Sequence, residues 1–178
     1  MRKRPRSAGR SSERRVAKPV LTLVGFACVV APSLLPCSPL LVWNASASVP
    51  VGLYRLAPGT PVRGDLVLVR LPEPLRDLAA ERGYLPPSVP LIKHLAAEVD
   101  DSVCADGEAV SINGRRVVQR RAKDRSGRPL PAWAGCQTLP RGSVFLLGDD
   151  TPASFDSRYF GPIPEAAIVG RLVPIWTE

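Results

Sequence analysis

Short apolar runs bounded by polar and turn residues recur from about residue 50 onward, and they predict β-strands. The clearest is Asp65–Leu71 (DLVLVRL). In Val110–Val118 (VSINGRRVV), the pair Asn113-Gly114 stands between β-forming residues, which is a strong signal for a hairpin. Three further runs predict strands: Val89–Ala97, Gly142–Gly148 and Ile168–Trp176, the last of them broken at Pro174.

Helical pattern is scarce in this part of the chain. Only Pro74–Arg82 (PLRDLAAER) predicts a helix, of about two or three turns. Lys123–Pro131 (KDRSGRPLP) reads as a polar loop. Twenty prolines and fourteen glycines favour short strands with irregular connections. We therefore predict a mostly β fold, a partly closed barrel.

The N-terminal part has a different pattern, because no charged residue occurs from Pro19 to Tyr54. The apolar stretch Val20–Leu35 reaches the length that a bilayer span needs, roughly 20 residues, when it is extended to Trp43. We therefore predict one transmembrane helix at residues 19–43, kinked or ended near Pro32 and Pro36.

The formal charge of +8 first suggests a nucleic-acid partner, but its distribution argues against one. Residues 1–18 hold eight Lys or Arg and one Glu, so almost all of the net positive charge lies in this tail. By the positive-inside rule the tail is cytoplasmic. The predicted organisation is a basic tail at 1–18, an inner-membrane anchor at 19–43 and a body at 44–178, which is periplasmic in a Gram-negative cell.

A cleaved signal peptide is the alternative interpretation of the same segment. It also has a basic start, an apolar centre and a small-residue exit, and Ala45-Ser46-Ala47 reads as a cleavage site. Cleavage there would leave Ser48 as the new N-terminus.

The cysteines separate into two pairs. Cys28 and Cys37 belong to the predicted span, whereas Cys104 and Cys136 lie in the body and can form a disulfide in an oxidising compartment. No Cys-x-x-Cys occurs and His94 is the only histidine, so we expect no metal site. No phosphate-binding glycine loop is present, and we expect no cofactor.

Three separated motifs carry candidate chemistry. Ser48, with Ser46 two residues earlier, directly follows the predicted span. Lys93 has the apolar neighbours Leu91, Ile92 and Leu95 in a strand pattern, which would lower its pKa and make it a competent base. Taken singly, Ser48 could be an ordinary loop serine, and Lys93 could extend from a strand edge to water.

The third motif runs from Gly148 to Gly161. The spacing of Asp156 and Arg158 lets them form an ion pair, and Ser154 could hydrogen-bond the lysine amine. A solvated surface turn is the alternative interpretation of this segment.

In this order behind a span, the three motifs resemble those of the type I signal peptidase family, and most closely its conjugative-transfer subfamily, TraF. The resemblance rests on SVPVGLY (48–54), RGYLPPSVPLIK (82–93), INGR (112–115), GRPLPAW–GC (127–136) and DSRYFGP (156–162). It implies that Ser48 is the nucleophile and Lys93 the base. It further implies an oxyanion hole from Ser46 and the Ser48 amide, with Ser154, Asp156 and Arg158 in support.

The chain departs from the family pattern at two places. His94 stands where the family usually has arginine, and Val99-Asp100-Asp101 replaces a Pro-Gly-Asp turn. The resemblance favours retention of Ala45-Ser46-Ala47 as part of the active site, although self-cleavage there stays open.

The implied substrate is a secreted precursor, namely a pilin or another conjugation component. The resemblance leaves open whether water resolves the acyl-enzyme by hydrolysis or the substrate's own amine resolves it, which gives a cyclic product. Two alternatives remain at this point. A LexA-like self-cleaving protein shares the Ser/Lys chemistry but has no span, and a non-catalytic bitopic subunit of a secretion apparatus has the span without the chemistry.

Overall fold

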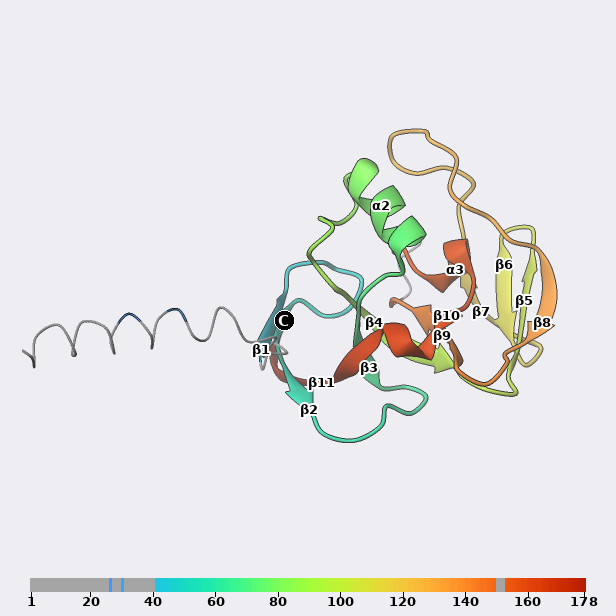
Figure 1. Ribbon diagram of the computed structural model, residues 1–178. Helices are drawn as coiled ribbons and strands as arrows, with labels where there is room; N and C mark the ends of the chain where they lie inside the picture. Colours follow the sequence, from blue (N-terminus) through green and yellow to red (C-terminus); the bar gives the residue numbers. More distant parts are fainter. Residues whose placement is uncertain (1–25, 27–29, 31–40, 150–152) are drawn as a thin grey trace, which may run out of the picture. The chain divides into compact units, whose positions relative to one another are not determined.

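The computed structural model describes residues 26, 30, 41–149 and 153–178, and within this part the protein is mostly β, as predicted (Figure 1). The strands are β1 (Leu41–Asn44), β2 (Gly52–Ala57), β3 (Leu66–Val69), β4 (Leu91–Ala97), β5 (Ser102–Asp106), β6 (Ala109–Ile112), β7 (Arg115–Gln119), β8 (Gly135–Thr138), β9 (Ser143–Leu147), β10 (Ile163–Pro164) and β11 (Ile168–Thr177). The helices are α2 (Glu73–Glu81), α3 (Ser157–Phe160) and the 3-10 turn η1 (Glu165–Ala167).

Seven strands form a curled, open sheet in the order β1-β2-β11-β3-β4-β9-β10. All its neighbouring strands are antiparallel. The order brings β4 between β3 and β9, so the Lys93 segment and the segment that leads into Gly148 lie side by side.

The final strand differs from the prediction, because β11 continues through Pro174 to Thr177. Its pairing with β3 extends only to Leu172, so at Pro174 the strand has β2 as its single neighbour. A proline is tolerated where no partner strand needs its missing N–H. The pairing with β2 shifts register between Pro174 and Trp176, which absorbs the irregularity.

A second sheet of four strands has the order β7-β6-β5-β8. The hairpin predicted at Asn113-Gly114 joins β6 to β7, with φ of 51° and 77° at these two residues. Cys104 of β5 lies opposite Cys136 of β8, and the two form a disulfide with an S–S distance of 2.05 Å.

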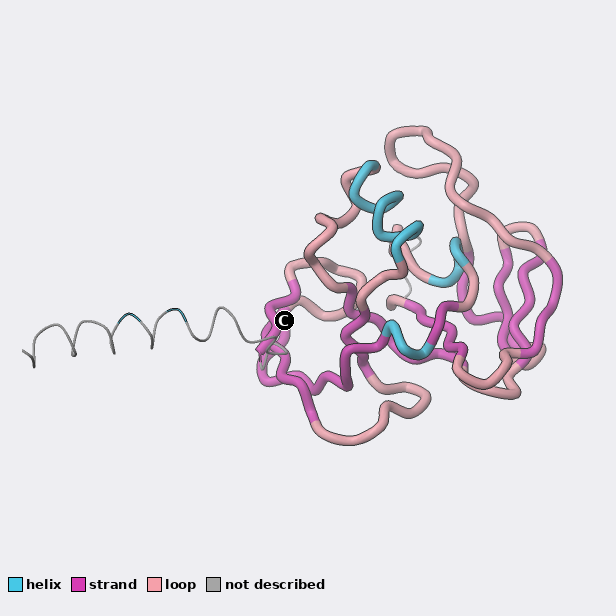
Figure 2. Tube along the Cα trace, viewed as in Figure 1, coloured by secondary structure: helices cyan, strands magenta, loops and turns pink. Residues whose placement is uncertain are grey.

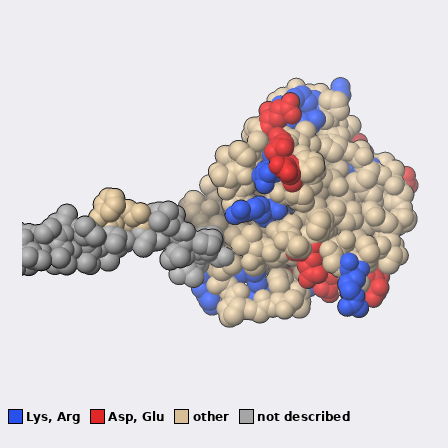
Figure 3. Space-filling view, in the orientation of Figure 1, with Lys and Arg blue, Asp and Glu red and all other residues tan. Residues whose placement is uncertain are grey.

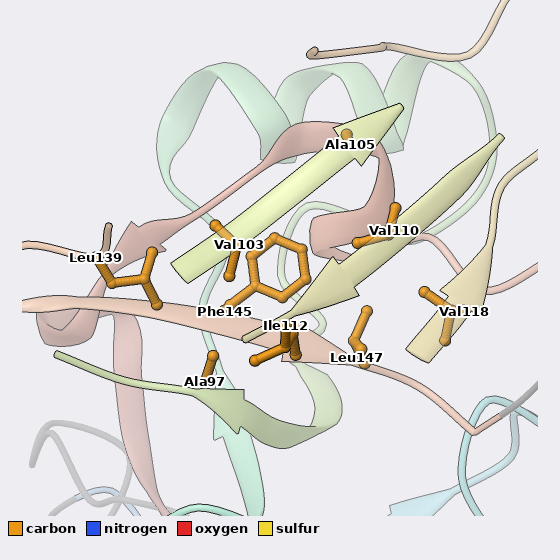
Figure 4. Close-up of a cluster of buried hydrophobic side chains, with 9 residues drawn as sticks. All are labelled: Ala97, Val103, Ala105, Val110, Ile112, Val118, Leu139, Phe145 and Leu147. Carbon is orange, nitrogen blue, oxygen red and sulfur yellow. The ribbon is translucent and has the colours of Figure 1, made fainter. Parts of the chain in front are cut away.

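Phe145 of β9 connects the two sheets. Figure 4 shows its ring at the centre of a cluster to which both sheets contribute, and it is fully buried. The other members are Ala97, Val103, Ala105, Val110, Ile112, Val118, Leu139 and Leu147. Because this core fixes β9 against the four-stranded sheet, the chain enters the Gly148 segment from a rigid strand.

The helix α2 begins after Pro72 and contributes Ala79 to a smaller cluster with Leu71, Phe155 and Tyr159. The long connection between β7 and β8, residues 120–134, has only one isolated bridge, between Lys123 and Pro129 (Figure 2). This agrees with the polar loop predicted at Lys123–Pro131.

The tail at 1–18 and most of the anchor predicted at 19–43 lie outside the described residues, as do Cys28 and Cys37. Residues 41–43, the end of that predicted anchor, belong to β1 and pair with β2. No helix within the described ranges has the length and apolar character required to cross a membrane.

Candidate active site

Ser48 lies in the connection between β1 and β2, and the buried side chain of Asn44 holds this connection in shape. The Asn44 Nδ2 group donates hydrogen bonds to the carbonyl oxygens of Ser46 (2.8 Å), Val49 (3.1 Å) and Pro50 (3.0 Å). Its Oδ1 accepts from the amide and the hydroxyl of Ser46, at 3.1 and 3.0 Å. The hydroxyl oxygens of Ser46 and Ser48 are 3.1 Å apart, so the loop places them together.

Lys93 extends from β4 and is 2% exposed. Its Nζ donates a hydrogen bond to the Ser154 hydroxyl over 2.9 Å. Burial lowers the pKa of Lys93 to about 8, because removal from water disfavours the ammonium; the carboxylate of Asp156 opposes this effect. A lysine with this pKa is neutral in a substantial fraction of molecules near pH 8, which a proton acceptor requires.

Asp156 and Arg158 form a fully buried ion pair rather than a solvated surface turn. The Arg158 Nε donates to Asp156 Oδ1 over 2.8 Å, and its Nη2 donates to Oδ2 over 3.0 Å. The same carboxylate accepts from the amides of Gly148 (2.8 Å) and Arg158 (3.1 Å). The pair therefore fixes the backbone on both sides of Ser154.

Gly148 and Asp149 bring this segment against the Ser48 loop. The Asp149 amide donates to the Ser48 carbonyl over 2.7 Å. A Cβ at Gly148 would lie 2.3 Å from the Ser154 hydroxyl oxygen and 2.8 Å from the Ser48 carbonyl oxygen. Only glycine permits this close approach, which joins the segment that carries Ser154 to the loop that carries Ser48.

His94, the residue that departs from the family pattern, pairs with the Asp149 side chain, at 2.9 Å from Nε2 to Oδ1. Its Nδ1 lies 3.3 Å from the carbonyl oxygen of Gly64. The other segment that departs from the family pattern, Val99-Asp100-Asp101, still forms a tight turn. Asp100 adopts a φ of 70°, and the Asp101 carboxylate accepts a hydrogen bond from the Glu98 amide over 3.0 Å.

The two predicted catalytic side chains line one cavity of about 530 Å³. Ser46 and Ser154 line it as well, with apolar walls that include Leu85, Leu91 and Phe155. Asp156 and Arg158 are not among the lining residues, so they act on the site without contact to a substrate, through the backbone that they hold and through their charges near Lys93. Within the described residues, no group of three His, Cys, Asp or Glu side chains is placed to hold a metal ion.

Two residues of this site had no role assigned from the sequence, Asn44 and Gly148. Asn44 gave only the weak signal of a polar residue beside a turn, and Gly148 that of a strand end. Their roles depend on partners that the chain brings close only when it folds.

The sequence of residues 13–177 matches the family model described as signal peptidase, peptidase S26. The chain belongs to this family. The resemblance seen in the motifs is thereby confirmed, and membership implies a serine endopeptidase.

Among its relatives, this S26 chain is 33% identical over 144 residues to the plasmid transfer protein TraF of Escherichia coli, a match that covers 75% of this chain and 81% of the relative. It is 36% identical over 149 residues to the conjugal transfer protein TraF of Agrobacterium fabrum, with the same two coverages. The solved structure of a signal peptidase I from Enterococcus faecalis matches 66% of this chain and all of its own, at 21% identity and a TM-score of 0.40.

Proposed function

We propose that the chain is a membrane-anchored serine endopeptidase with Ser48 as nucleophile and Lys93 as general base. The observation that supports it best is the buried Lys93 amine, held by Ser154 in the cavity that Ser48 also lines. An ammonium at such a position is costly, and a neutral amine is what the proposed chemistry needs.

The reaction proceeds through an acyl-enzyme. Neutral Lys93 accepts the Ser48 hydroxyl proton while Oγ forms a bond to the scissile carbonyl carbon. As the C–N bond breaks, the lysine ammonium returns the proton to the leaving amine. Water, deprotonated by the same lysine, then cleaves the ester and restores Ser48.

The oxyanion is stabilised by the Ser48 amide and the Ser46 hydroxyl. In the free protein the Ser46 hydroxyl donates to Asn44 Oδ1. It must therefore turn toward the substrate when the oxyanion forms. One such donor is typically worth about 3 kcal/mol in the transition state.

The proposed substrate is a secreted precursor, and a pilin or another conjugation component is the first candidate. The support is the identity to proteins named plasmid transfer and conjugal transfer protein TraF.

The test is cleavage of a pre-pilin peptide by the full chain in detergent. We expect activity that is lost in Ser48→Ala and Lys93→Met and kept in Arg115→Met, which removes an exposed cation of β7 away from the cavity. Mass spectrometry of the product separates hydrolysis, which adds water, from cyclisation. Cleavage that survives Ser48→Ala contradicts the proposal.

We further propose a single-pass inner-membrane topology with residues 1–18 in the cytoplasm and the catalytic body in the periplasm. The support is the basic tail followed by the uncharged segment up to Tyr54. Reporters fused after residue 60 should be active only when they require the periplasm. Activity of a cytoplasmic reporter at this position contradicts the proposed topology.

A further inference from the structure

The cavity that contains Ser48 and Lys93 extends to a strongly basic wall, formed by the end of α2 and the β7–β8 connection. The charged residues that line this part are Arg82, Arg121, Lys123, Arg125, Arg128 and a single acid, Asp124.

Two of these cations, Arg128 and Arg82, interact with other residues of the same wall. The Arg128 Nε pairs with Asp124 Oδ2 over 2.7 Å, and the Arg128 guanidinium lies over the Tyr84 ring at 5.6 Å. The Arg82 Nη1 donates to the Pro129 carbonyl over 2.6 Å. The Asp124 carboxylate also accepts from the Tyr84 hydroxyl over 2.6 Å. The negative charge of Asp124 is therefore already offset within the wall.

The other three cations, Arg121, Lys123 and Arg125, form what we call the basic rim. All three are exposed, and within the described part of the chain none of them forms an ion pair. On α2, Glu73 and Asp77 share Arg76 as their partner, and neither they nor Glu81 line the cavity. Figure 3 shows acidic side chains in a column over α2 and basic ones beyond them, over the tip of the β7–β8 connection.

The connection that carries the rim is held in one conformation by Asp124. The Asp124 Oδ1 accepts hydrogen bonds from the backbone amides of Ser126 and Arg128, each over 2.9 Å. A preorganised cationic surface loses little conformational entropy when a ligand binds.

We propose that the basic rim is a specificity subsite that binds carboxylate side chains of the precursor segment held at Ser48. This inference rests on the proposed function. Because the rim lines the same cavity as Ser48 and Lys93, a peptide that reaches the nucleophile passes beside it. Anionic lipid headgroups would be attracted by the same charges, but they need no access to a peptidase cavity.

The expected size of the preference follows from the exposure of the rim. A solvent-exposed ion pair of average strength changes affinity by about threefold, so two pairs multiply to roughly tenfold at low salt. Raising the ionic strength should reduce the preference, because the screening length is about 8 Å at physiological salt.

The experiment uses the full chain in detergent and peptides that differ only in charge. Two glutamates, two glutamines or two lysines are moved stepwise along a precursor peptide on both sides of the scissile bond. We measure kcat/KM on the active enzyme and Kd on Ser48→Ala. The charge-reversal variant is R121E/R125E. Its matched control, R115E/R116E, makes the same change on exposed arginines of β7 that do not line the cavity.

We expect the glutamate peptide, at one or more positions, to be favoured about tenfold over the glutamine peptide. R121E/R125E should reverse the order so that the lysine peptide is favoured over the glutamate peptide. R115E/R116E should keep the wild-type order.

Three results overturn the inference. One is an absence of charge preference at every position while Ser48-dependent cleavage persists, which leaves the proposed function intact. Another is an equal effect of R121E/R125E and R115E/R116E on the charge preference, which would assign this preference to the net charge of the protein and not to the basic rim. The third is loss of binding to anionic lipid vesicles in R121E/R125E with an unchanged peptide preference, which assigns the rim to lipid. If no peptide is cleaved, whatever the position of its charged pair, the proposed function itself has failed. Equal Kd values of the three peptides for Ser48→Ala would then overturn the subsite as well.

Discussion

The amide of Asp149 donates a hydrogen bond to the carbonyl oxygen of Ser48 over 2.7 Å. This contact joins two of the three motifs through main-chain atoms alone. The remaining motif, that of Lys93, is joined to them by the hydrogen bond from Lys93 to Ser154. The proposed nucleophile and the proposed base thus both contact the segment that follows β9.

Gly148→Ala should abolish or strongly reduce activity, by about a hundredfold or more in kcat, because the new Cβ would overlap the Ser154 hydroxyl and the Ser48 carbonyl. The urea midpoint of unfolding, measured on the same preparation, separates a displaced site from a general loss of folding. Wild-type kcat in a folded Gly148→Ala protein would show that the approach of the two segments is unimportant.

Ser46→Ala should lower kcat by about a hundredfold with a smaller effect on KM, because it removes a donor that acts on the oxyanion. Ser46→Thr should retain partial activity, since it keeps the hydroxyl beside Ser48. An unchanged kcat in Ser46→Ala would exclude this hydroxyl from the mechanism.

The pH profile should report the titration of Lys93. Since the base must be neutral, kcat/KM should rise with pH and level off above a pKa of about 8, well below the ordinary lysine value. Lys93→Arg should be inactive, because its guanidinium stays charged throughout this range. An acidic limb that persists in an active Lys93 variant would identify another base, and His94 would be examined first.

Lys93→Met should be inactive yet more stable than the parent at neutral pH. The folded-state pKa of Lys93 is lowered from 10.5 to about 8, so between these values the unfolded chain binds the proton and the folded chain does not. The free energy of unfolding of the parent should therefore rise with pH from about 8 to 10.5, by on the order of 3 kcal/mol. Urea unfolding across this range should show the rise in the parent and lose it in Lys93→Met.

Removal of the disulfide should reduce stability and leave the catalytic geometry in place. Cys104 and Cys136 are 32 residues apart in the sequence, and in the loop-entropy model such a cross-link contributes roughly 3 to 4 kcal/mol. We expect the Cys104→Ser/Cys136→Ser variant to unfold at lower urea with nearly normal kcat at 25 °C. Labelling of both thiols in the native, unreduced protein would contradict the disulfide.

The sequence by itself determined most of the strands, because short apolar runs and turn residues encode them locally. The Asn113-Gly114 hairpin is an example, since these residues readily adopt the positive φ that its turn needs. The predictions differ from the structure at residues 41–43, which form part of β1, and at Pro174, where the strand continues because β3 no longer pairs with β11 there.

The three motifs were also visible in the sequence, because each consists of side chains with distinctive chemistry at short spacing. Only the tertiary structure decided how they meet. The burial of Lys93, the space at Gly148 and the Asp149–Ser48 contact depend on segments up to about a hundred residues apart in the chain. The contact between Asp149 and Ser48 involves a backbone amide and a carbonyl, groups that nearly every residue type carries alike. Such groups leave no mark in a sequence, and their partners become defined only when the curled sheet brings β4 and β9 together behind the Ser48 loop.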